Sequence, residues 1–120
     1  MSKTLVLGAS TNPERYSYLA ARRLTAAGHE VELIGGREGA IGENPIRTGR
    51  PALSEIDTVT LYLGPKRQEG LLPYLTDTLN AKRVIFNPGT ENAELQAELR
   101  ERDVEVVEGC TLVMLSAGTY

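Results

Sequence analysis

Short apolar runs alternate along the chain with longer segments in which apolar residues recur every three or four positions. The short runs predict β-strands at 4–7, 30–34, 58–63, 83–86 and 104–107. The longer segments predict helices at 15–27, 65–79 and 91–102. Because strands and helices alternate, we predict an α/β fold: a Rossmann-like, doubly wound and mainly parallel sheet of five to six strands with helices on both faces.

The first helix has clear sequence signals at both ends. Asn12 can cap it with Pro13 at the first helical position, or Thr11 and Glu14 can form a capping box. Gly28 is a natural stop after its last turn. The two strands that flank this helix then form a β-α-β unit, whose crossover is expected to be right-handed.

Two segments have weaker patterns. Residues 35–55 contain five glycines and two prolines without a helical period. They predict a surface connection with a short edge strand near Ile46, and a ligand role for part of it is as plausible as a purely structural one. The alternating acids of 104–107 suit an edge strand, and the apolar residues 110–115 predict a short helix that covers the sheet.

Composition limits the classes of protein that fit. The 120 residues suggest one domain, 1–120, with 41% hydrophobic and 24% charged residues, as in an ordinary globular protein. The net charge of −3 argues against nucleic acid or an anionic membrane as partner. Met1-Ser2-Lys3 leads into a strand rather than an apolar signal segment, and one cysteine cannot form an internal disulfide. We therefore expect a cytoplasmic protein without a structural metal.

Candidate ligand contacts come from the ends of the predicted strands. In a doubly wound sheet the ligand crevice lies beyond the carboxyl ends of the strands. Four of the five strand ends carry a glycine within two residues, and cations follow two of them. This small, cationic rim predicts an anionic, nucleotide-like ligand. The expected rim residues are Gly8, Gly35, Gly64 and Gly89 for clearance, and Arg37, Lys66 and Arg67 for charge.

The end of the second strand bears on which nucleotide is bound. NAD sites usually place an acidic residue there to hold the ribose hydroxyls. In this chain Gly35 and Gly36 are followed by Arg37, which suits a phosphate on the ribose, as in NADP or coenzyme A. Glu38 lies close enough to hold the ribose hydroxyls instead, so NAD stays among the alternative ligands. The first turn has only Gly8, so it is not the G-x-G-x-x-G fingerprint.

Several segments together carry a family resemblance: the Gly-Ala-Ser-Thr-Asn-Pro turn at 8–13, Gly-His-Glu-Val at 28–31, Asp-Thr-Val at 57–59, and a late strand reaching Cys110. The chain resembles the small single-domain CoA-binding proteins, which are similar to the CoA-binding domain of the succinyl-CoA synthetase α subunit. The resemblance implies coenzyme A or an acyl-CoA as ligand. It also implies that the phosphates lie near Gly8, Ala9, Ser10, Thr11, Asn12, Tyr16 and Ser17. Asn87 stands where related sequences have a glutamine-bearing segment; it can supply that amide or cap the following turn.

Residues suited to catalysis are few. His29 precedes a strand and is expected at the rim opposite the crevice, while Cys110 is expected on the ligand rim, either as a reactive thiol or, as we favour, as a small buried residue. No Ser-His-Asp set or paired carboxylates can be assembled. We therefore predict non-catalytic binding. Two alternatives stay open: an NAD(P)-binding redox enzyme or regulator, and a protein-interaction module on a degenerate nucleotide-binding fold, acting through residues 112–120 on a second copy or another protein.

Overall fold

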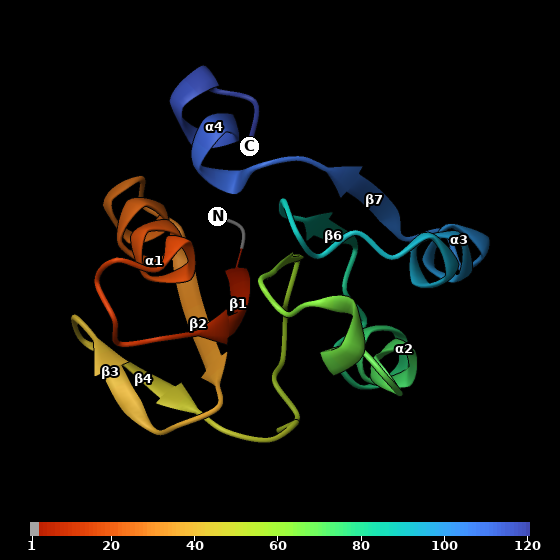
Figure 1. Ribbon diagram of the computed structural model, residues 1–120, viewed down its shortest axis with the longest axis horizontal. Helices are drawn as coiled ribbons and strands as arrows, with labels where there is room; N and C mark the ends of the chain where they lie inside the picture. Colours follow the sequence, from red (N-terminus) through yellow and green to blue (C-terminus); the bar gives the residue numbers. More distant parts are fainter. Residues whose placement is uncertain (1–2) are drawn as a thin grey trace.

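The computed structural model describes residues 3–120; Met1 and Ser2, which we predicted to lead directly into the first strand, lie outside the described residues. Seven strands form one sheet in the order β3-β4-β2-β1-β5-β6-β7 (Figure 1). All neighbouring pairs are parallel except β3 and β4. The strands are β1 (Lys3–Ala9), β2 (Glu30–Gly35), β3 (Gly39–Ile41), β4 (Asn44–Arg47), β5 (Thr58–Leu61), β6 (Arg83–Phe86) and β7 (Glu105–Glu108).

Helices cover both faces of the sheet, which confirms the predicted doubly wound, Rossmann-like fold (Figure 1). Successive residues of a strand point to opposite faces. Leu5 and Leu7 accordingly join the larger core cluster, whereas Val6 joins the smaller one. The larger cluster lies under α2 (Leu71–Pro73), η2 (Tyr74–Thr78) and α3 (Ala93–Glu101), with the exposed turn η1 (Pro65–Arg67) preceding α2. The smaller cluster lies under α1 (Tyr16–Ala26) and α4 (Thr111–Ala117). The short helix predicted for 110–115 is confirmed as α4.

The sheet has two more strands than the clearest patterns indicated, because residues 39–47 form a hairpin. Its strands are joined by a two-residue turn at Gly42 and Glu43, with Gly42 at φ 61°. The strand expected near Ile46 is confirmed as β4, but β3 and not β4 occupies the edge. A glycine in such a turn is typical of tight hairpins. The flanking glycine and proline have weak strand propensity, which explains why the pattern was difficult to detect.

The single helix predicted over 65–79 is wrong. The segment begins as the 3₁₀ turn η1, bends at Gly70 (φ 68°), and continues as α2 and the π-helical turn η2. The left-handed conformation of Gly70 interrupts the helical path, and Pro73 has no N–H with which to extend a regular ladder.

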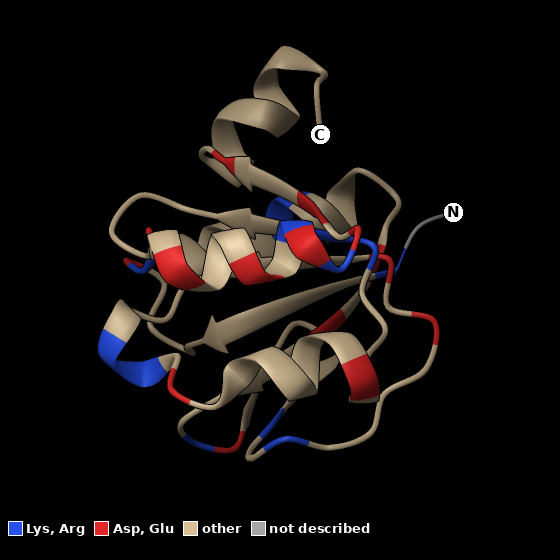
Figure 2. Ribbon diagram, turned by 90° about the vertical axis from the view of Figure 1, so that its right-hand side faces the viewer, with Lys and Arg blue, Asp and Glu red and all other residues tan. Residues whose placement is uncertain are grey.

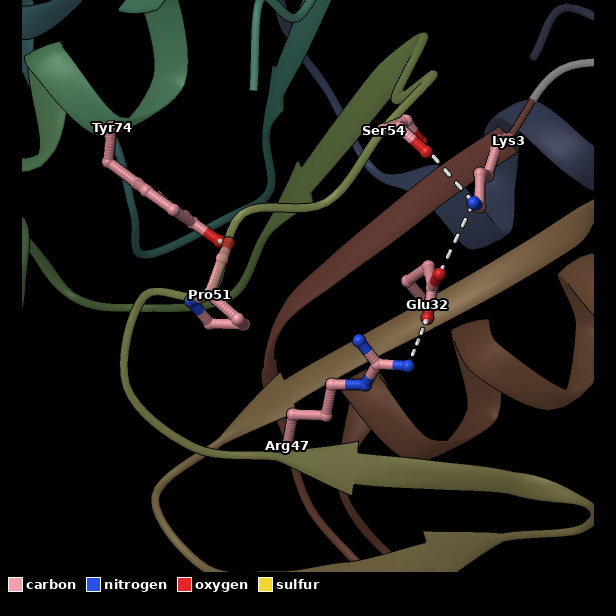
Figure 3. A network of polar contacts seen from close by, with 6 residues as sticks. All are labelled: Lys3, Glu32, Arg47, Pro51, Ser54 and Tyr74. Atoms are coloured by element: carbon pink, nitrogen blue, oxygen red, sulfur yellow. Dashed lines mark hydrogen bonds and ion pairs between the residues drawn. The ribbon is translucent and has the colours of Figure 1, made fainter. Parts of the chain in front are cut away.

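The connection from β4 to β5 packs against the body of the protein. Leu53 and Ile56 are buried in the larger core cluster. The Tyr74 hydroxyl donates to the Pro51 carbonyl at 2.7 Å (Figure 3). At the other end of the connection, the Lys3 ammonium donates to the Ser54 carbonyl at 3.3 Å. Glu32 forms ion pairs with Lys3 at 3.3 Å and with Arg47 at 3.9 Å. These contacts fix the path of the connection from β4 to β5.

Candidate functional site

The strand order reverses between β1 and β5, and a crevice lies at the carboxyl ends of these two strands. The chain builds β2, β3 and β4 on one side of β1 before it crosses to β5, β6 and β7 on the other. Doubly wound sheets bind their ligands at such a reversal. Two adjoining cavities of about 410 and 560 Å³ lie here, and both are lined by Ala9, Ser10, Arg15 and Gly36. We call them together the switch-point crevice.

The crevice has two lobes of different character. The β5-side lobe is additionally lined by Gly8, Tyr16, Ser17, Tyr62, Leu63, Arg67 and Pro88. The β2-side lobe is additionally lined by Thr11, Asn12, Arg37 and Glu38. The first therefore has an aromatic and aliphatic wall, and the second is almost entirely polar.

Two rim glycines allow neighbouring backbones to approach each other. A Cβ on Gly8, which has φ 106°, would lie 3.0 Å from the carbonyl carbon of Tyr62. A Cβ on Gly35 would lie 2.2 Å from the carbonyl oxygen of Ala9. The space left by the missing side chains of Gly8 and Gly35 is thus needed by the neighbouring backbone of the protein itself. Gly36, and not Gly35, lines the crevice.

The N-terminus of α1 opens onto the crevice, although the predicted start of this helix is wrong. The Asn12 and Ser10 side chains act within the preceding turn: Ser10 Oγ accepts from the Asn12 N–H at 3.1 Å, and Asn12 Oδ1 accepts from the Glu14 N–H at 3.0 Å. Arg15 is the N-cap residue and makes no side-chain capping bond. The first N–H groups of α1 therefore lack both an intrahelical partner and a side-chain cap, and they favour an anion.

Three arginines add positive charge around this terminus. Arg15, Arg37 and Arg67 are exposed and line the crevice. Within residues 3–120 the ion pairs involve Lys3, Arg47 and Glu32, so none of the three crevice arginines is paired with an acid. Arg67 follows Lys66 in the basic turn η1 (blue in Figure 2). The crevice is thus electrostatically suited to phosphate.

Tyr62 contributes a neutral wall. Its hydroxyl is buried and has no well-formed hydrogen bond within the described part of the chain. Burial raises the pKa of Tyr62 to about 12, and the nearby Thr60 and Thr111 hydroxyls offset only part of that increase. The side chain is therefore uncharged near neutral pH and does not oppose an anionic ligand.

Of the predicted contacts, eight line the crevice: Gly8, Ala9, Ser10, Thr11, Asn12, Tyr16, Ser17 and Arg37. Five do not: Gly35, Gly64, Lys66, Asn87 and Gly89. Asn87 is buried, and its Nδ2 donates to Thr60 Oγ1 at 2.8 Å and to the Leu61 carbonyl at 2.9 Å. Its Oδ1 accepts from the Thr111 N–H at 2.9 Å. The amide thus holds the start of α4, and its role as a ligand contact stays a prediction.

The crevice also contains residues that we did not predict as contacts: Arg15, Tyr62, Leu63 and Pro88. Tyr62 and Leu63 directly follow β5, so the rule of carboxyl ends was sufficient to nominate them. Arg15 was missed because we placed the helix cap at Asn12 or Thr11, whereas Arg15 is the N-cap residue.

The residues considered for catalysis lie elsewhere. His29 directly precedes β2 and packs edge-on against Tyr120, with ring centroids 4.9 Å apart. Cys110 is partly buried and directly precedes α4. Among residues 3–120, no three His, Cys, Asp or Glu side chains are grouped to hold a metal ion. Of the helices in the same range, none has the length and apolar character needed to cross a bilayer.

Comparisons with known proteins support the fold and identify the family. A crystal structure of an uncharacterized protein is 51% identical, with a TM-score of 0.95, 100% of this chain covered and 98% of the other. Two further solved structures share the fold. A hypothetical protein from Pyrococcus horikoshii OT3 is 23% identical, with a TM-score of 0.84, 97% of this chain covered and 82% of the other. A structure from Thermus thermophilus is 20% identical, with a TM-score of 0.86, 99% of this chain covered and 90% of the other. No curated protein matches. The family model described as CoA binding domain matches residues 2–116, and the chain therefore belongs to the CoA binding domain family.

Proposed function

We propose that the switch-point crevice binds coenzyme A or an acyl-CoA without catalysing its reaction. The observation that carries this proposal is the uncapped N-terminus of α1, which opens onto a crevice with three arginines that form no ion pair within residues 3–120. A helix N-terminus and guanidinium groups both favour phosphate oxygens. Membership of the CoA binding domain family supports coenzyme A as the source of these phosphates.

The shared floor of the two lobes is the proposed diphosphate site. Backbone N–H groups near Ser10 supply neutral donors on this floor, those near Ser17 add donors from the β5-side lobe, and Arg15 supplies charge. The Ser10 hydroxyl accepts one bond in the turn and keeps its own proton for donation. In this assignment Arg37 reads the phosphate on the ribose in the β2-side lobe.

Binding without catalysis is supported by the composition of the walls. Among the described residues, Glu38 is the only carboxylate that lines the crevice, and no histidine or cysteine does. Glu38 is therefore the one general base that these described residues provide, and it has no histidine or cysteine in the lining to activate. The chain supplies recognition, through backbone donors, arginines and an apolar wall.

A panel of ligands tests the proposal through thermal unfolding. A ligand that binds only the folded state stabilises it, by about 2.7 kcal/mol at a concentration one hundred times its Kd. Coenzyme A and acetyl-CoA are expected to raise Tm clearly, and NAD and NADP to raise it less. Larger shifts with NADP, or no shift with any ligand, would contradict coenzyme A binding.

A matched pair of variants locates the effect. Ser10→Tyr places a large ring on the crevice floor and is expected to abolish the shift with coenzyme A while the protein stays folded. Ser54→Tyr makes the same change at an exposed position outside the crevice, and the shift is expected to remain. Retention of the full shift in Ser10→Tyr would exclude this crevice as the site.

A further inference from the structure

Gln68 is a buried amide directly behind the wall of the crevice. It follows Arg67 at the end of η1, and its side chain is 4% exposed. Its backbone N–H donates to the Pro65 carbonyl at 3.1 Å, which closes the turn. Its side chain does not face the crevice, yet it is bonded to the segments that form it.

Three hydrogen bonds join this side chain to the loops after β5 and β6. Gln68 Nε2 donates to the carbonyl oxygens of Leu63 at 2.9 Å and Thr90 at 2.8 Å. Gln68 Oε1 accepts from Asn92 Nδ2 at 2.9 Å. Two donors on one nitrogen and an acceptor beside it are what a primary amide provides. One side chain therefore spans from Leu63, on the crevice wall, to the loop that carries Pro88.

The two lobes suit different parts of coenzyme A. Tyr62, Leu63 and Pro88 give the β5-side lobe an apolar wall, which suits the methylene groups of the pantetheine arm. Arg37 and Glu38 give the β2-side lobe charged and hydrogen-bonding groups, which suit a phosphorylated ribose. The loops that Gln68 joins belong to the first of these lobes.

We propose that Gln68 is a positioning residue that holds the β5-side lobe in the shape that accepts the pantetheine arm. This inference rests on the proposed binding of coenzyme A. A wall held by buried, fully satisfied hydrogen bonds loses little freedom when the ligand arrives, which favours affinity. Gln68 therefore governs affinity for the pantetheine part of the ligand and leaves affinity for the nucleotide part unchanged.

Gln96 offers a matched control within the same network. It is 2% exposed; its Oε1 accepts from the Asn92 N–H at 2.8 Å, and its Nε2 donates to Glu108 Oε2 at 2.6 Å. Gln96 is thus as buried as Gln68, but its side-chain bonds reach no residue that lines the crevice. Loss of this amide tests for general damage to the network.

The experiment compares coenzyme A with adenosine 3′,5′-bisphosphate, its nucleotide part, by calorimetric titration. The proteins are wild type, Gln68→Met and Gln96→Met, each first checked by circular dichroism to be folded. Methionine keeps the length of the side chain and removes its hydrogen bonds. In Gln68→Met, coenzyme A is expected to bind at least about fivefold more weakly, while the bisphosphate stays within about twofold of wild type. In Gln96→Met, both affinities are expected to stay within about twofold.

Other outcomes overturn the proposal at distinct points. If wild type binds neither ligand, the proposed function fails and this inference fails with it. If wild type binds coenzyme A but Gln68→Met weakens both ligands equally, weakens neither, or behaves as Gln96→Met does, only the positioning role is wrong. If Gln68→Met does not fold, the side-chain amide signals of Gln68 in wild type decide by NMR. They are expected to shift with coenzyme A and not with the bisphosphate; unchanged signals with coenzyme A would overturn the role.

Discussion

On the β5–β6 side of the crevice, buried side-chain amides join the loops 62–70 and 87–92, whereas on the β1–β2 side the loops 10–15 and 36–38 are mostly exposed. Gln68 makes three hydrogen bonds within this pair of loops. Asn87 makes three that join the second loop to β5 and to the start of α4. In the loops on the β1–β2 side, Ser10 and Asn12 make single short-range bonds at exposed positions. The β1–β2 side instead depends on glycine clearance and on the uncapped start of α1.

This difference indicates how one crevice can combine a fixed wall with an adaptable cradle. Buried, satisfied amides specify one geometry because each broken bond leaves a polar group without a partner. Exposed turns have fewer constraints, and their backbone N–H groups can adjust to a phosphate. We therefore expect substitutions on the β5–β6 side to lower stability, with loss of the Gln68 amide also weakening coenzyme A binding. Substitutions on the β1–β2 side are expected to act mainly on binding unless they affect close backbone contacts.

The largest effect is expected from Asn87→Ala. It removes three hydrogen bonds and leaves the Leu61 carbonyl and the Thr111 N–H without their partner. The free energy of unfolding is expected to fall by about 3 kcal/mol. Asn12→Ala, on the other side, removes one exposed bond and is expected to cost about 0.5 kcal/mol. Urea unfolding measures both, and equal losses would contradict the contrast between the two sides.

Gly35→Ala is expected to show the exception on the β1–β2 side. The added Cβ would lie 2.2 Å from the Ala9 carbonyl oxygen, so β1 and β2 must separate locally. We expect a loss of at least about 2 kcal/mol of unfolding free energy. Gly36→Ala, where the added Cβ meets nothing within 4 Å, is expected to stay within about 0.5 kcal/mol of wild type. Similar stabilities for the two variants would show that the close approach is not required.

Arg15→Ala is expected to separate binding from folding. Because Arg15 is exposed and makes no ion pair with the described acids, its loss should change stability by less than about 0.5 kcal/mol. Coenzyme A affinity is expected to fall about tenfold, the loss of one charge-assisted contact, as measured by calorimetry. Arg100→Ala removes the same charge from α3 and serves as the control. An equal loss of affinity in Arg100→Ala would indicate a long-range charge effect in place of a contact.

Tyr62→Phe is expected to have the smallest effect. The hydroxyl is buried and has no well-formed hydrogen bond to residues 3–120, so its removal should leave the free energy of unfolding unchanged or raise it by up to about 1 kcal/mol. Burial raises the folded-state pKa of Tyr62 from 10.0 to about 12, so ionisation favours the unfolded state. The contribution of the protonated Tyr62 hydroxyl to the free energy of unfolding is therefore fully present below pH 10 and is lost as the pH rises towards 12. Urea unfolding across this range should show a shallower loss in Tyr62→Phe, and an unchanged slope would contradict the cause given.

The features that depend on local sequence pattern could be predicted from the sequence alone. Apolar runs located the strand at 83–86 and predicted one over 58–63, which ends two residues earlier, at Leu61, in the structure. Glycines with cations indicated the carboxyl-end rim. The sequence did not reveal that Asn87 is buried, because the partners of its amide lie 24 to 27 residues away in the chain. The start of α1 was misjudged because Asn12 and Ser10 form bonds that compete with helix capping. Long-range hydrogen bonds and choices among local caps are settled by tertiary packing.

The most direct test of the central claim is to map the backbone amide signals of the wild-type protein during titration with coenzyme A by NMR. We expect the largest shifts at Ser10, Arg15, Tyr16 and Ser17, with further shifts at Arg37 and Leu63. A second cavity, at the opposite end of the sheet, is lined by Lys3, Asp57 and Lys82 and provides an internal reference. Shifts confined to that cavity, or an unchanged spectrum at saturating coenzyme A, would contradict binding at the switch-point crevice.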